Sequence, residues 1–424
     1  MNPARNWPIC KLKLTHYPTN VYIDLGTGFN EPTISGNAAA ANDVTLGSLA
    51  TSDSTTLLSI LDGGSLNATE LIAGADNYEG AVSVAGANST LVATFQYIGF
   101  SGNGTLTVSS GGSVSSLAVF DVGEQAGSNG NVTVTGANST LSAPGILNVG
   151  LSGNGTLTVS NGGNVTAGSI AESVEPGATG NITVTGANST LSLTGSLYDG
   201  ESGNGTLTVS NGGNVSGGSL DIGPFPGSTG IATVDGAGST ASASYVFVGG
   251  DGNGTLTVSN GGNVTASSQF ILGDDGGSAG TLSVDGLGSV AGSSGFFIVG
   301  EGGSSVANVT NGGAIAVTGE DGEDEGVYLG YESGENSSLL ISGVNSVGNV
   351  SSSLNVTEGG VAVGLDGNGT LTVADGAVAN LSGRDSNDAG LDIGQEFDGT
   401  GSVTVTGVNP VGNLASTLNV TQTR

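Results

Sequence analysis

A unit of about 25 residues repeats along most of the chain, and it limits the possible folds more than any other feature. The segment GNGTLTVSNGG occurs unchanged from Gly153 and again from Gly203. Such regular spacing indicates an architecture built by stacking one supersecondary unit. Glycines mark the start of successive units at Gly80, Gly104, Gly130, Gly155, Gly180, Gly205, Gly230, Gly254 and Gly280.

Each unit carries the alternating pattern of a strand with one buried face. In the segment TLTV at 156–159, Leu157 and Val159 are expected to point inward, while the threonines face solvent. The NGG that follows at 161–163 suits a sharp turn, because Asn and Gly tolerate positive φ. A second short strand is expected around Val165, and most units close with a third.

Three short strands cannot bury their apolar side alone, so the units must pack on one another. Antiparallel hairpins are the competing fold, since NGG also suits a hairpin turn. Identical residues recur at the spacing of one coil, and this favours stacking each strand on its equivalent in the next coil. We therefore expect an all-β fold with nearly no helix, a parallel β-solenoid (β-helix) of about 25-residue coils.

The repeat also suggests how the chain is organised. Residues 1–29 break the pattern and are rich in aromatic residues, so we expect part of this segment to cap the solenoid. Residues 30–424 form the repeat region, which is most regular over 80–300 and irregular over 301–424, where EDGEDEG at 320–326 is expected on an acidic loop. The repeat continues to the last residues, and an open strand edge there would favour end-to-end self-association.

Charge excludes several partners and argues against catalysis. The chain has 36 acidic and 5 basic residues and a net charge of −31, so it should repel nucleic acid and anionic membranes. No run of eighteen apolar residues is present, so no membrane-spanning helix is expected. Lysine is absent beyond Lys13, His16 is the only histidine, and Arg384 stands alone, so polysaccharide lyase chemistry lacks its usual bases. The pair Asp274 and Asp275 could serve as acid and base, but such pairs are more often solvated turn residues.

Metal and cofactor sites are not expected either. The segments from Asp251 and from Asp366 begin like calcium loops, yet neither has the later bidentate glutamate, and both suit turns better. Cys10 is the only cysteine, so no multi-cysteine metal site can form. The acidic loop could recruit a weakly bound divalent ion, although a solvated loop is the commoner outcome. We expect no catalytic, cofactor-binding or metal-binding residues.

One outward feature is a candidate binding face. Threonines occupy the same place in seven units, so a solenoid would align them in a ladder that could order water, as in ice-binding β-helices, or bind glycans. The alternative is that threonine is simply a good residue for a solvent-facing strand. The ladder consists of Thr107, Thr133, Thr158, Thr183, Thr208, Thr233 and Thr257.

The motifs GNGTLTVSNGG and VTVTGANSTLS resemble the tandem repeat of bacterial autotransporter (type V secretion) and PEP-CTERM-associated proteins over roughly residues 56–424. The resemblance implies a β-helix passenger that is secreted or exposed on the outer surface of a bacterium. The first twenty residues lack the apolar stretch of a signal peptide, so an extracellular location is expected from the resemblance alone.

These features together predict a non-catalytic extracellular or cell-surface repeat protein, a passenger or stalk for display, adhesion or surface structure. Its partners would be glycans, matrix or other cells. Two alternatives remain open at this stage: a polysaccharide-active β-helix enzyme, and ice or glycan binding through the outward threonine ladder.

Overall fold

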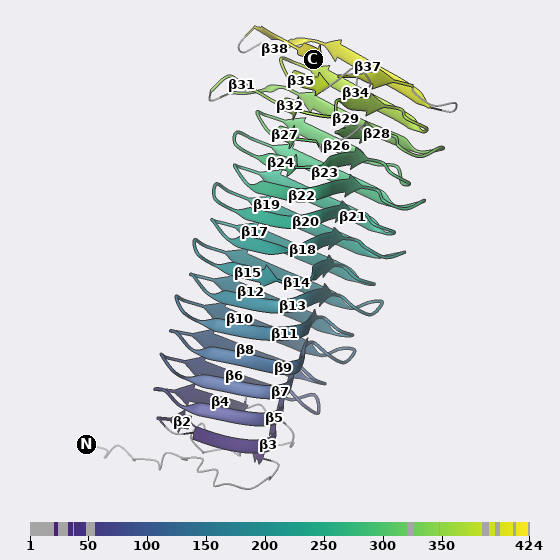
Figure 1. The fold of residues 1–424 in the computed structure, drawn as a ribbon. Helices are drawn as coiled ribbons and strands as arrows, with labels where there is room; N and C mark the ends of the chain where they lie inside the picture. Colours follow the sequence, from purple (N-terminus) through teal and green to yellow (C-terminus); the bar gives the residue numbers. More distant parts are fainter. Residues whose placement is uncertain are drawn as a thin grey trace, which may run out of the picture. The chain divides into compact units, whose positions relative to one another are not determined.

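The computed structural model describes residues 21–23, 33–36, 38–47, 56–319, 326–346, 348–383, 390–394, 399–409 and 413–422. Every regular element in this part of the chain is a strand, and no helix occurs in it (Figure 1). The chain divides into two compact units, residues 1–195 and 196–424. The expected parallel β-solenoid is confirmed within each unit.

In the first unit, each coil gives one strand to each of two parallel sheets. Sheet A of this unit contains β2 (Thr33–Ser35), β4 (Thr56–Leu61), β6 (Glu79–Ala85), β8 (Asn103–Ser109), β10 (Asn129–Thr135), β12 (Asn154–Ser160) and β14 (Thr179–Thr185). Sheet B contains β1 (Val21–Ile23), β3 (Ala38–Leu46), β5 (Ser65–Ala73), β7 (Thr90–Ile98), β9 (Ser113–Val122), β11 (Thr140–Val149), β13 (Asn164–Glu172) and β15 (Thr190–Leu193).

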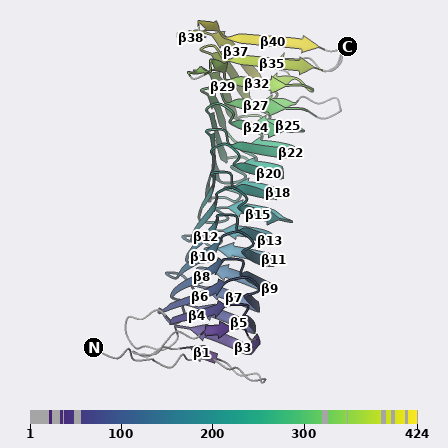
Figure 2. The same cartoon turned by 90° about the vertical axis from the view of Figure 1, so that its left-hand side faces the viewer.

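The second unit repeats this plan with more interruptions. Its sheet A contains β17 (Asn204–Ser210), β19 (Thr229–Asp235), β21 (Asn253–Ser259), β23 (Ala279–Asp285), β26 (Val306–Thr310), β29 (Asn336–Ser342), β34 (Asn368–Ala374) and β37 (Thr400–Thr406). Its sheet B contains β16 (Ser196–Asp199), β18 (Asn214–Ile222), β20 (Thr240–Val248), β22 (Asn263–Leu272), β24 (Val290–Ser293), β25 (Phe296–Val299), β27 (Ala314–Val317), β28 (Val327–Leu329), β32 (Ser353–Val356), β33 (Val361–Val363), β35 (Val378–Gly383), β36 (Asp392–Ile393) and β40 (Thr417–Gln422). Figure 2 shows β18, β20 and β22 stacked in order.

Two antiparallel ribbons interrupt the second unit. They pair β30 (Val344–Asn345) with β31 (Val350–Ser351), and β38 (Val408–Asn409) with β39 (Leu414–Ala415). These ribbons explain why the repeat changes in GVNSVGNV and GVNPVGNL: each forms an excursion between a sheet A strand and a sheet B strand. Of the acidic insertion at 320–326, only Gly326 lies among the described residues, so its expected loop is not described.

The NGG turn has the predicted conformation. Asn161 and Gly162 have φ values of 53° and 83°, and the Gly163 amide donates to the Ser160 carbonyl at 3.0 Å. A Cβ on Gly163 would lie 2.5 Å from the Val134 carbonyl oxygen of the preceding coil. A side chain would therefore collide with backbone, so the second glycine is required by the close approach of two coils.

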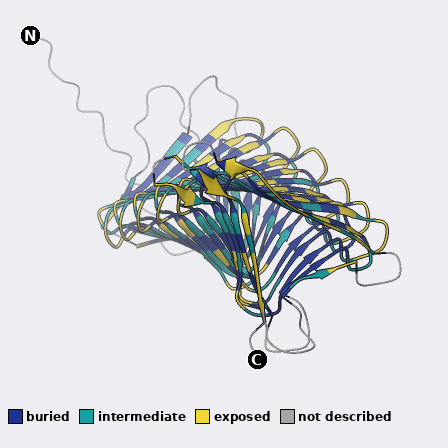
Figure 3. Ribbon diagram, turned by 90° about the horizontal axis from the view of Figure 1, so that it is seen from above, coloured by how far each residue is buried: buried dark blue, intermediate teal, exposed yellow. Residues whose placement is uncertain are grey.

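The core is a set of aliphatic columns running through successive coils. Val108, Val134, Val159 and Val184 form one such column in the first unit, and each is 0% exposed. Viewed from above, buried segments line the inner side of the ribbon and many loops are exposed (Figure 3). The burial of these valines confirms the expected inward assignment. Burying each such side chain stabilises the fold by about 1.5–3 kcal/mol.

The segment before the repeat is described in only one place. β1 pairs in parallel with β3, with Val21 opposite Val44 and Ile23 opposite Leu46. The remaining residues of 1–29 lie outside the described part of the chain, so the N-terminal cap stays a prediction.

Candidate functional site

The structure places the predicted threonines in register within each unit. Thr107, Thr133, Thr158 and Thr183 are consecutive partners on sheet A of the first unit. Thr208, Thr233 and Thr257 occupy the equivalent column in the second unit. Each side chain is half-buried and faces away from the aliphatic core. The ladder therefore exists as a column in each unit, while its role in binding stays a prediction.

An amide ladder runs beside the threonine column of the first unit. Asn154 donates through Nδ2 to Oδ1 of Asn129 at 2.9 Å, and Asn129 donates to Asn103 at 2.9 Å. The Thr179 hydroxyl donates to Asn154 at 2.5 Å. Asn103, Asn129 and Asn154, which each precede the first glycine of a unit, therefore bond along the stack, which gives them a structural role.

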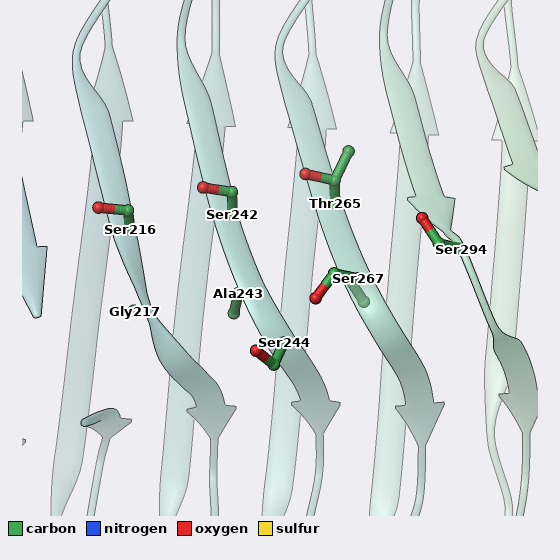
Figure 4. A pocket seen from close by; sticks show the side chains of 9 residues that line it. Ser216, Gly217, Ser242, Ala243, Ser244, Thr265, Ser267 and Ser294 are labelled. Carbon is green, nitrogen blue, oxygen red and sulfur yellow. The ribbon is translucent and has the colours of Figure 1, made fainter. Parts of the chain in front are cut away.

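A groove on sheet B of the second unit was not anticipated from the sequence. It is open and shallow, with a volume of about 340 Å³, and hydroxyl groups from four successive coils line it. Figure 4 shows the hydroxyls of Ser216, Ser242 and Thr265 at the same level on successive strands, pointing the same way. The lining residues are Ser216, Gly217, Ser242, Ala243, Ser244, Thr265, Ala266, Ser267 and Ser294.

The groove forms where the sheet B strands bend. Between β20 and β22 the register shifts after Ala243, which pairs with Ala266, so that Tyr245 pairs with Gln269. One coil later the strand is interrupted, because β24 ends at Ser293 and β25 begins at Phe296. Small side chains at the bend leave the space that larger residues would fill.

Beyond the groove, aromatic side chains lie on β20, β25 and β28 and in the turn after β28. We call Tyr245, Phe247, Phe296, Tyr328 and Tyr331 the aromatic strip. Tyr245 is 42% exposed and stacks on Phe247 with ring centroids 6.2 Å apart. Phe296 lies 6.1 Å from Tyr328, which makes an edge contact with Tyr331 at 5.2 Å. The strip begins at Tyr245, directly after the groove residue Ser244.

A small apolar cluster anchors the aromatic strip. Ile271, Ile298, Tyr328 and Ala362 are buried on the outer side of sheet B, apart from the main core. Phe247, Phe296 and Tyr331 of the strip pack against this cluster, together with Leu365. This packing restricts the rings of Phe247, Phe296 and Tyr331, which are half-buried, so these three rings offer a pre-formed surface.

Carboxyl groups lie at the end of the same strands. Asp274 follows β22, and stacking brings Glu301, which follows β25, beside it in the next coil. Burial, with added repulsion from Asp274 and a hydrogen bond to it, raises the pKa of Glu301 to about 7. The pKa of Asp274 is also raised, chiefly by burial and then by the charge of Asp275. The sequence pointed to Asp274 and Asp275 but not to Glu301.

The first unit has an acidic group of its own. Burial raises the pKa of Glu124 to about 7, and the charges of Asp121 and Glu70 add to the effect. Burial also raises the pKa of Asp121, while its hydrogen bond from Asn148 at 2.7 Å acts in the opposite direction. Burial makes the charged form of these carboxyl groups unfavourable, so protonation stabilises them in the folded protein.

Within the described ranges, no three His, Cys, Asp or Glu side chains are placed to hold a metal ion. Asp251 sits in the turn before β21, and Asp366 in the turn before β34, as the sequence suggested. No described segment is a helix long and apolar enough to cross a bilayer.

The segment Asn-Ser-Thr, which matches the acceptor pattern for N-glycosylation, occurs at 138–140 and 188–190 and has a structural explanation. Asn138 and Asn188 adopt positive φ values of 63° and 64°, and the serines that follow them are fully buried. Ser189 donates to the Thr185 carbonyl at 2.8 Å and accepts from the Gly162 amide at 3.0 Å. The recurring NST is thus a turn with a buried serine clip.

No protein-family model matches the chain, and no curated protein matches it in sequence. Among solved structures, the chain is similar to the crystal structure of a TibC-catalysed, hyper-glycosylated fragment of TibA. The two chains are 18% identical, the match covers 90% of this chain and 99% of that fragment, and the TM-score is 0.40. Membership of the autotransporter and PEP-CTERM repeat families remains a prediction from the sequence motifs.

Proposed function

We propose that this chain is a non-catalytic extracellular or cell-surface protein, a β-helical passenger or stalk that displays, spaces or adheres on a bacterial surface. The supporting observation is the in-register stack of each unit, in which an aliphatic core carries repeated outward columns of small polar side chains. Such a surface offers the same groups many times, and weak contacts made in parallel give high avidity.

Surface exposure is the first test. An antibody against the chain should label intact producing cells, and external protease should remove that label without permeabilisation. Labelling only after permeabilisation would overturn the proposed location. A cytoplasmic enzyme of the same cells serves as the control for membrane integrity.

Adhesion and catalysis can be separated with the purified chain. Beads coated with it should bind cells or polysaccharide matrices, while incubation with neutral and acidic polysaccharides should release neither reducing ends nor unsaturated products. Steady product release that depends on Asp274 or Asp275 would favour the alternative, a polysaccharide-active enzyme.

The threonine column supports a second candidate function, binding of ice or glycans through sheet A. Its members lie in register and are half-exposed in both units. Ice growth in the presence of the chain is the direct test. Shaped crystals that revert to discs when Thr158 and Thr183 are replaced by bulky Lys would establish it, and unshaped crystals would exclude ice binding.

A further inference from the structure

We propose that the hydroxyl-lined groove and the aromatic strip of the second unit together form a binding site for an uncharged β-1,4-linked hexose chain, lying along the stack. This inference deepens the adhesive function proposed above and rests on it for its biological role. It assigns the site to sheet B, away from the threonine column.

The first argument is the chemistry of the surface. Sugars combine a ring of hydroxyl groups with apolar faces, so their sites pair hydrogen-bonding groups with exposed aromatic rings. The groove supplies hydroxyls on Ser242, Ser244 and Ser267, and the strip supplies the ring of Tyr245 beside them. The neighbouring contact with Phe247 holds that ring in place.

The second argument is the repeat distance. Successive strands lie about 4.8 Å apart, which is close to the length of one pyranose unit in a β-1,4-linked chain. Ser216, Ser242 and Thr265 are partners on consecutive strands, so each sugar unit along the stack would meet an equivalent hydroxyl.

The aromatic residues follow a matching double spacing. Tyr245 pairs with Gln269, and Gln269 pairs with Phe296, so the two rings are separated by two coils. Alternate units of a β-1,4-linked chain present the same face to a surface. The rings of Tyr245 and Phe296 would therefore stack on every second sugar, while Gln269 lies opposite the unit between them.

The third argument is charge. All five basic residues of the sequence lie outside the described residues, so no described side chain is a Lys or Arg that could pair with an acidic sugar. The net charge of −31 gives the chain a negative potential. Uronate and sulfated chains would thus be repelled, and an uncharged chain is favoured.

Binding should be measured by isothermal titration of the full chain with four probes: cellohexaose, N-acetylchitohexaose, maltohexaose and a galacturonate hexamer. We expect at least one of the two β-1,4-linked probes to bind, and the α-linked and acidic probes to bind at least about tenfold more weakly, a difference of about 1.4 kcal/mol. No binding by either β-linked probe, or equal binding by all four, would overturn the proposal.

Three variants locate the site. Tyr245→Ala removes the exposed ring and Ser267→Phe fills the groove, and each should weaken binding at least about fivefold. Ile231→Ala removes a 45% exposed apolar side chain from sheet A of the same unit and should leave binding unchanged. Melting curves confirm that each variant is folded. Binding that survives both Tyr245→Ala and Ser267→Phe would overturn the assignment of the site.

The outcomes separate this inference from the broader function. Adhesion of chain-coated beads by a chain that binds neither β-1,4-linked probe in titration would overturn the groove and leave the adhesive function standing. Titration that supports the groove in a chain that never reaches the cell surface would instead overturn the proposed location.

Discussion

The Ser189 hydroxyl accepts a hydrogen bond from the backbone amide of Gly162, one coil earlier, at 3.0 Å. The same hydroxyl donates to the Thr185 carbonyl, so one buried side chain joins the turns of two coils. Equivalent bonds join Ser139 to Gly111, Ser239 to Gly212 and Ser289 to Gly261.

Replacing Ser189 with Ala should lower the free energy of unfolding by about 1–3 kcal/mol, because the fully buried hydroxyl no longer bonds the Gly162 amide and the Thr185 carbonyl. Denaturant titration measures the change. Ser142→Ala on the outward face of β11 is the matched control and should change stability by less than about 0.5 kcal/mol. Equal effects of the two substitutions would contradict the role assigned to the clip.

Inward and outward positions of β12 should respond very differently to substitution. Val159 is 0% exposed, so Val159→Asp would bury an unpaired carboxylate and should cost several kcal/mol. The same outcome is expected for Leu207→Asp in the second unit. Thr158→Ser on the outward face should cost little, and a similar drop in melting temperature for Thr158→Ser and Val159→Asp would be inconsistent with the alternation observed.

Gln96 interrupts a core column of the first unit, between Leu71 and Phe120. Its side chain is 0% exposed; Nε2 donates to the Ser115 carbonyl at 2.8 Å, and Oε1 has no partner among the described residues. Gln96→Leu should raise the free energy of unfolding by about 1 kcal/mol, because a buried unsatisfied oxygen is removed.

Gln96→Ala provides the comparison for that column. It removes the same polar group but leaves a cavity between Leu71 and Phe120, so it should lower stability by roughly 2 kcal/mol. Destabilisation by both variants would indicate that the amide itself is required.

Stability should decrease as pH rises through the titration of the buried carboxyls. Glu124 and Glu301 have pKa values near 7 in the folded protein against an ordinary value of 4.5, and Asp221 is near 6 against 3.8. The folded state therefore holds protons that the unfolded state releases, and folding is favoured at low pH. Their contribution is complete below about pH 4 and is lost between there and about pH 7.

Melting temperatures between about pH 5 and pH 8 test this expectation. The double variant Glu124→Gln and Glu301→Gln should flatten the dependence, since neither amide titrates. Glu175→Gln, at an exposed position, is the control. A melting temperature that rises with pH in the unmodified chain would contradict the assignment.

The last described coil exposes residues that are buried one coil earlier. Val405 is 43% exposed while its partner Val373 is 0% exposed, and Val420 is 47% exposed opposite Leu381 at 1%. We expect the 424-residue chain to self-associate through this edge, and added salt to strengthen the association by screening the net charge of −31. Sedimentation at low and high salt measures this, and a strict monomer under both conditions would contradict it.

The sequence predicted those features that depend on a strict period. Alternation of Leu157 and Val159 with threonine identified the buried face, and the NGG turn followed from its tolerance of positive φ. The coil length then placed Thr107 and Thr133 in one column.

The groove and its aromatic strip could not be predicted in the same way. Ser and Gly fit a turn, a strand or a bend equally well, so Ser244 and Ser267 gave no sign that the strand bends there. Tyr245 and Phe296 are far apart in sequence, and only the register shift between β20 and β22 fixes which outward residues align. Asp274 and Glu301 are also far apart in sequence, and only the stacking of their coils brings the two carboxyl groups together.

The in-register ladder of the first unit also determines which changes of length the chain tolerates. Loss of one whole coil, residues 130–154 for example, would place Val108 against Val159 and Thr107 against Thr158, the same residue types as before. A single inserted residue within β12 would instead turn every later side chain of that strand to the opposite face. An insertion or deletion of one complete repeat would therefore lengthen or shorten the stack and preserve its register. The length of such a protein can change in evolution while the residue types of its core columns stay the same.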